Sequence, residues 1–151
     1  MPGWTMELLA GERITRAFWL ILALPVPFWL AVLFFPSARV VRHICHPMVA
    51  PTLLLIPLIY LYYQAWDLGG IVWPGGVGYT EAQSVVVHPM GFLILWCQIQ
   101  IMHLFLGFVL YQHACRTGLR IPIELIACWV LGPLGLLVYL GRLLVQRVMR
   151  G

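Results

Sequence analysis

The chain has 151 residues, of which 62% are hydrophobic and only 9% are charged, and its mean hydropathy is +0.94. This composition excludes an ordinary soluble domain and indicates an integral membrane protein. All nine basic residues are arginines, and the absence of lysine excludes a Schiff-base cofactor and a Walker-type phosphate loop.

Four apolar stretches are long enough to cross a bilayer as helices. They comprise residues 18–35, 48–66, 89–113 and 121–140. The sequence therefore predicts an all-α, polytopic membrane protein, a bundle of four transmembrane helices that forms one domain over residues 1–151. The N-terminal segment lacks the apolar core of a cleavable signal peptide, so we expect the first stretch to direct insertion.

Prolines and glycines mark where these helices change direction. Pro25 and Pro27 interrupt the first stretch and predict a kink, because proline cannot donate a backbone hydrogen bond. Pro122 and Glu124 suit the first turn of the last helix. The sequence GPLG, residues 132–135, predicts a bend in that helix or a close approach by a neighbouring helix.

The third stretch carries polar side chains at membrane depth. At 100° per residue, Trp96, Gln100, His103 and Gly107 form one stripe, whereas Gln98 points the opposite way. One interpretation is that the stripe is a ligand-binding site with His103 and Gln100 as its polar anchor. The other is that these side chains hydrogen-bond between helices and fix their packing.

Other ligand chemistry has weaker signals. No second histidine lies at the depth of His103, so haem or a pigment could be ligated by this residue alone. Metal-ligand residue types also gather on the side of the short loops, at His43, Cys45, His46, His113 and Cys115. Their spacing matches no defined site, so we predict no metal site and assign no cofactor.

The arginines do not determine orientation if the chain crosses four times. One face then carries Arg39, Arg42, Arg116 and Arg120, and the other carries Arg13, Arg16, Arg142, Arg147 and Arg150. Four against five gives no positive-inside bias, so orientation stays open. We expect the first group to form a rim that contacts anionic lipid headgroups. No basic domain stands clear of the membrane, so no nucleic-acid partner is predicted.

Several segments resemble the ABA-deficient-four-like family, named for a plastid membrane protein needed for neoxanthin formation. The similar segments read LPVPFWLAVLFFPSARVVRHI, PTLLLIPLIYLYYQAW, WCQIQIMHLF and GPLGLLVYL, and they cover most of the chain from about residue 18. In the third helix, Gln98 occupies the family's histidine position and His103 its aspartate position. Phe108 occupies the arginine position, so the family's charged pair is replaced here.

The resemblance implies a four-helix membrane protein that acts on or near carotenoids. It does not extend to an isomerising activity that depends on the replaced charges. We therefore expect the protein to bind, or to assist the processing of, an apolar isoprenoid such as a carotenoid, in a bacterial inner or intracytoplasmic membrane. The alternative is a non-catalytic subunit, structural or pigment-associated, of a larger photosynthetic or respiratory complex. Its expected partners are membrane lipids, the isoprenoid and, in the alternative, the subunits of that complex.

Overall fold

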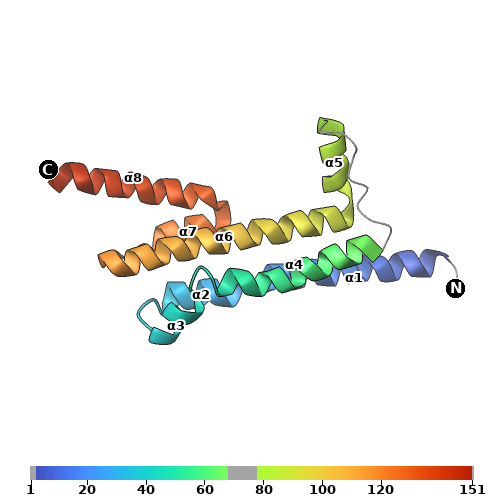
Figure 1. Ribbon diagram of the computed structural model, residues 1–151, viewed down its shortest axis with the longest axis horizontal. Coiled ribbons are helices and arrows are strands. Elements are labelled where there is room, and N and C mark those ends of the chain that lie inside the picture. Colours follow the sequence, from blue (N-terminus) through green and yellow to red (C-terminus); the bar gives the residue numbers. More distant parts are fainter. Residues whose placement is uncertain (1–2, 68–77, 151) are drawn as a thin grey trace. The chain divides into compact units, whose positions relative to one another are not determined.

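The computed structural model describes residues 3–67 and 78–150, and the secondary structure of these residues is entirely helical (Figure 1). This confirms the predicted all-α class. The helices are α1 (Gly3–Ala23), α2 (Val26–Phe34), α3 (Arg39–Ile44), α4 (Ala50–Asp67), α5 (Tyr79–Val87), α6 (Pro89–Thr117), α7 (Pro122–Leu131) and α8 (Pro133–Arg150).

The chain divides into two compact units. Unit 1 contains residues 1–24 and 54–99, and unit 2 contains residues 25–53 and 100–151. Unit 1 therefore holds α1, α5, most of α4 and the first part of α6. Unit 2 holds α2, α3, α7, α8 and the rest of α6.

Two helical stretches in the described residues are long and apolar enough to cross a membrane. They are residues 11–34 and 89–117, which coincide with the first and third predicted spans. The helix α4 corresponds to the second predicted span, but it does not reach the same hydropathy. Length and composition thus support two of the four predicted spans.

The predicted kink in the first stretch is present. The helix α1 ends at Ala23 and α2 begins at Val26. Pro25 and Pro27 have no backbone N–H group, so two hydrogen bonds of a continuous helix cannot form there. In contrast, Pro57 lies inside α4 without ending it.

The fourth predicted span is wrong as a single helix. The chain reverses at Gly132, whose φ of +58° is accessible to glycine at little cost, and α8 returns along α7. A Cβ atom on Gly135 would lie 2.4 Å from the backbone nitrogen of Cys128, so the two helices touch through backbone atoms. The predicted bend and close approach at residues 132–135 are both confirmed, but the bend is a complete reversal (Figure 1).

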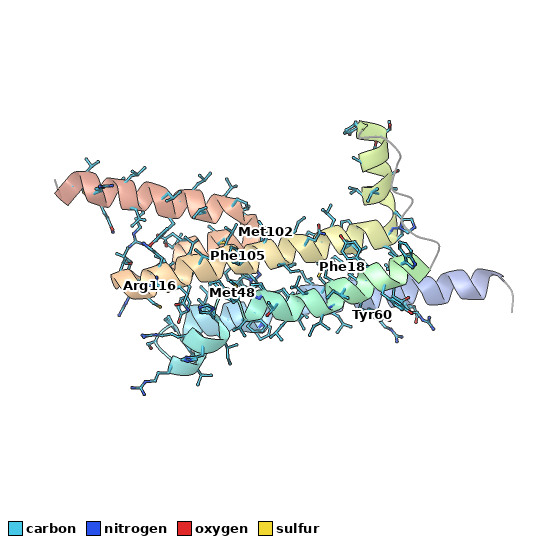
Figure 2. The ribbon with its side chains drawn as sticks, in the orientation of Figure 1. Phe18, Met48, Tyr60, Met102, Phe105 and Arg116 are labelled. Atoms are coloured by element: carbon cyan, nitrogen blue, oxygen red, sulfur yellow. The ribbon has the colours of Figure 1, made fainter. Side chains whose placement is uncertain are left out.

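The reversal relocates Arg142, which a four-crossing topology places on the face opposite Arg120. Arg142 instead donates hydrogen bonds to the carbonyl oxygen of Arg120, at 3.0 Å, and to Glu124 Oε1, at 2.6 Å. Met102 and Phe105 of α6, both labelled in Figure 2, are exposed.

Candidate functional site

His103 forms a hydrogen bond to the backbone at the break between α7 and α8. The carbonyl of Trp129 would ordinarily accept a hydrogen bond from the backbone nitrogen four residues later, but that residue is Pro133. The imidazole Nδ1 of His103 lies 3.2 Å from the Trp129 oxygen and, with Nδ1 protonated, supplies the missing donor. A polar side chain on an apolar helix thus compensates a broken backbone ladder.

The same imidazole is enclosed by the turn that it stabilises. A Cβ atom on Gly132 would lie 2.2 Å from His103 Nε2, so only glycine fits beside the ring. The thiol of Cys128 donates in return to the His103 carbonyl, with 3.7 Å between sulfur and oxygen. Nε2 therefore faces the Gly132 backbone at close range, which favours the packing interpretation of His103 over ligation.

Gly107 gives Trp29 room to pack against α6. A Cβ atom on Gly107 would lie 2.2 Å from Cη2 of the fully buried Trp29 indole. That indole stacks on Trp129, with ring centroids 5.9 Å apart and planes 12° apart. Trp29 thereby joins α2, α6 and α7 within unit 2, and it is the largest buried side chain that the sequence-based interpretation missed.

Gln98 and Gln100 of α6 lie in different environments. Gln98 donates to the hydroxyl of Tyr62 on α4, at 2.9 Å. Gln100 is only 6% exposed, and its Oε1 is buried without a hydrogen-bond partner among the described residues. A buried acceptor in this state costs free energy unless a donor outside the protein reaches it.

Trp96 belongs to unit 1, whereas Gln100, His103 and Gly107 belong to unit 2. Trp96 stacks on Phe92, with ring centroids 6.1 Å apart, and it contacts Phe18 of α1 at the same centroid distance. Its indole Nε1 is buried and has no acceptor in the part of the chain that the structure describes. The stripe predicted as one site is therefore distributed over two environments.

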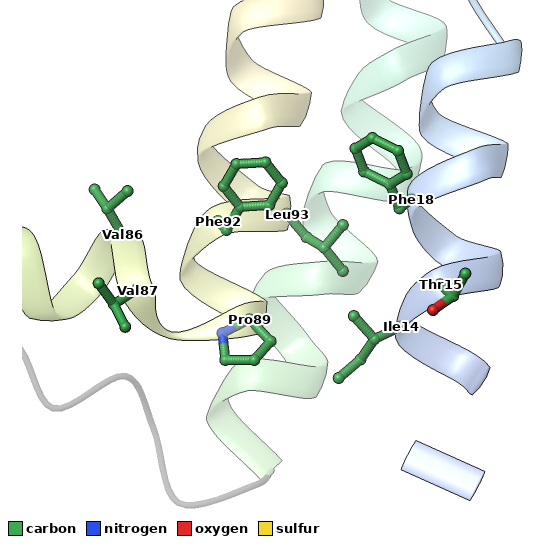
Figure 3. A pocket seen from close by; sticks show the side chains of 8 residues that line it. All are labelled: Ile14, Thr15, Phe18, Val86, Val87, Pro89, Phe92 and Leu93. Carbon is green, nitrogen blue, oxygen red and sulfur yellow. The ribbon is translucent and has the colours of Figure 1, made fainter. Parts of the chain in front are cut away.

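An open groove of about 510 Å³ lies beside this aromatic cluster. Its walls come from α1, the end of α5 and the start of α6, all within unit 1 (Figure 3). The lining residues are Ile14, Thr15, Phe18, Val86, Val87, Pro89, Phe92 and Leu93. Only the threonine is polar, so the groove suits an apolar chain and offers nothing to compensate a buried charge.

The metal-ligand residue types do not converge. Within residues 3–67 and 78–150, no group of three histidine, cysteine or acidic side chains is placed to hold a metal ion. Burial raises the pKa of the Cys45 thiol to about 11, so it stays protonated near neutral pH. A thiol must lose this proton to bind a metal, which burial opposes.

A buried ion pair in the α7–α8 hairpin was not predicted. Glu124 is 4% exposed and pairs with Arg142, which is 40% exposed, and the second carboxylate oxygen has no partner among the described residues. The sequence placed Glu124 only in the first turn of a helix. A glutamate eighteen residues before an arginine signals such a pair only when the reversal at Gly132 is known.

Comparison with known proteins identifies the family. A family model described as ABA DEFICIENT 4-like matches residues 16–139, which is most of the chain. No curated protein and no solved structure gives a significant match. The matched region includes the His103 junction and the groove residues other than Ile14 and Thr15, and the chain belongs to the ABA DEFICIENT 4-like family.

Proposed function

We propose that this protein is an integral membrane protein that binds an apolar isoprenoid, such as a carotenoid, in the groove between α1, α5 and α6. The groove carries the proposal, because its volume of about 510 Å³ lies in the range of small-molecule sites and its lining is almost wholly apolar. Family membership supports the carotenoid class, which the sequence resemblance implies.

Aromatic side chains favour a branched or conjugated chain over a simple acyl chain. Phe18 and Phe92 line the groove, and their rings lie 6.3 Å apart in a stacked arrangement. Such faces pack well against the methyl branches and double bonds of an isoprenoid. Unlike them, Trp96 does not line the groove, but its ring contacts both.

The Trp96 indole nitrogen is the proposed polar anchor. It is a buried donor without an acceptor in the described residues and does not line the groove, so a hydroxyl or carbonyl end group would satisfy it once Phe18 or Phe92, which its ring contacts, moves aside. Of the stripe predicted from the sequence, Trp96 thus keeps a ligand-binding role in this proposal. His103 and Gly107 serve packing, and Gln100 in unit 2 keeps an acceptor that has no partner among the described residues.

The proposal predicts a bound isoprenoid in protein purified in mild detergent. Solvent extracts and absorption spectra would be compared between wild type and Ile14→Trp, which fills the groove. Trp19→Ala is the matched control, because Trp19 is 60% exposed and does not line the groove. We expect loss of the isoprenoid only in Ile14→Trp, with thermal stability retained in both.

The outcome also separates binding from a subunit role. A colourless extract that contains only phospholipid, together with a native mass that includes other polypeptides, would favour a structural subunit of a larger complex. Equal isoprenoid content in wild type and Ile14→Trp would place the ligand elsewhere and refute the groove assignment.

A further inference from the structure

The α7–α8 hairpin reaches only to the middle of α6. Its turn at Gly132 packs on His103, which lies fourteen residues from each end of α6, about 21 Å at 1.5 Å per residue. The ten residues of α7 extend about 15 Å, half of a typical hydrocarbon core of about 30 Å. Irregular backbone at this depth is tolerated where protein covers it, as His103 does here.

Contacts in unit 2 place three segments at one end of α6. Tyr111 donates to the carbonyl of Pro36 at 2.6 Å, and Gln112 donates to that of Arg42 at 3.2 Å. The loop after α2 therefore lies beside the C-terminal end of α6. Arg142 binds the carbonyl of Arg120 just beyond that end, so α8 also returns there.

These contacts bear on the number of crossings. α2 ends beside the C-terminal end of α6, so if residues 11–34 and 89–117 each cross the bilayer, the chain must return to the opposite face before α6 begins at Pro89. Between residues 50 and 88, only α4, with 18 residues, is long enough among the described helices to make that crossing. Three crossings followed by a hairpin leave the segment before α1 and the tail on opposite faces.

The charge distribution then becomes strongly unequal. Seven arginines, Arg39, Arg42, Arg116, Arg120, Arg142, Arg147 and Arg150, fall on the hairpin face, against Arg13 and Arg16 on the other. The hairpin face carries one acid, Glu124, and a net charge of +6. The other face carries Glu7, Glu12, Asp67 and Glu81 and a net charge of −2, and the two values sum to the chain's +4.

We propose that α7 and α8 form a re-entrant hairpin and that the seven-arginine face rests on the anionic cytoplasmic leaflet. Loops rich in arginine face the cytoplasm, and each arginine near an anionic surface favours contact with it. The exposed arc of α8, with Leu137, Leu144 and Val148, supplies the apolar contact with lipid beside those charges. The inference rests on the proposed membrane embedding and is independent of the isoprenoid groove.

Cysteine labelling tests the topology. A membrane-impermeant maleimide is applied to intact bacteria and to inverted vesicles that carry the wild type, whose Cys115 is exposed. Cys115→Ser is the background, because the other three cysteines are buried. In this background Arg147→Cys reports the tail and Gln83→Cys reports α5, since both native side chains are exposed.

We expect Cys115 and Arg147→Cys to react only in inverted vesicles, and Gln83→Cys only in intact cells. Reaction of Cys115 and Arg147→Cys from opposite faces would overturn the hairpin, and reaction of both from outside would overturn the orientation. If lipid shields the tail thiol, a C-terminal reporter that fluoresces only in the cytoplasm decides, and a dark fusion overturns the proposal.

A lipid titration tests the partner. Wild type and Arg116→Gln/Arg147→Gln, which removes two exposed arginines, are reconstituted into phosphatidylcholine with and without phosphatidylglycerol. We expect phosphatidylglycerol to raise the Tm of the wild type more than that of the variant. An equal rise in both would overturn the assignment of anionic lipid to this face.

Discussion

His103→Leu is the substitution that most directly probes the hairpin. Leucine keeps much of the volume of the imidazole but removes the Nδ1 donor that lies 3.2 Å from the Trp129 carbonyl. Pro133 cannot supply a replacement donor, so the carbonyl stays without a partner in an apolar environment.

The expected loss of stability in His103→Leu depends on whether the Trp129 carbonyl finds another donor. Hydrogen bonds between membrane helices contribute about 0.6 kcal/mol on average, because the partner groups usually find alternatives. A carbonyl that is shielded from water and loses its donor costs about 1–3 kcal/mol. We expect the second range, with a fall in Tm of roughly 2–4 °C for each kcal/mol lost.

Thermal unfolding in mild detergent, followed by the exposure of buried cysteines to a fluorescent maleimide, would measure this. His103→Asn is the informative companion, because its amide places a donor near the position of Nδ1 but fills less space. Asparagine should therefore be less harmful than leucine. A leucine variant as stable as the wild type, or more stable than the asparagine variant, would show that packing alone holds the hairpin.

Three further substitutions test neighbouring parts of the account by the same unfolding assay. Gly132→Ala should lower the free energy of unfolding by at least about 1–3 kcal/mol, because alanine is strained at a φ of +58° and its Cβ collides with the imidazole. Gly141→Ala is the control: the space around Gly141 is open, so this variant should be neutral or slightly stabilising. Gly107→Ala should cost about 1–3 kcal/mol through a clash with the buried indole, and wild-type stability there would contradict the packing described. Arg142→Gln should destabilise more than Glu124→Gln, because it leaves a buried carboxylate unpaired, and the reverse order would refute the buried pair.

The sequence was sufficient for features that are encoded locally. Pro25 and Pro27 both lack backbone donors and lie within one turn, so the break between α1 and α2 was predicted from their positions. Helical periodicity likewise separates Gln98 from Gln100, and their different environments agree with it. Such features need no knowledge of which helices are neighbours.

Features that depend on tertiary contacts were missed or only partly predicted. The GPLG sequence indicates a bend, but it does not show that Gly132 adopts the φ of +58° at which the chain reverses. The loss of a donor at Pro133 could have been read from the sequence, yet nothing local shows that His103 replaces it. The pairing of Glu124 with Arg142 likewise follows from the reversal.

The location of the ligand is the central claim, and photo-crosslinking tests it most directly. A photoreactive isoprenoid is bound to the purified protein, activated by light, and located by peptide mass spectrometry. The account predicts adducts on the α1 and α6 segments around Phe18 and Phe92, and their loss in Ile14→Trp. Adducts concentrated instead around Gln100 and Trp129, unaffected by Ile14→Trp, would contradict it.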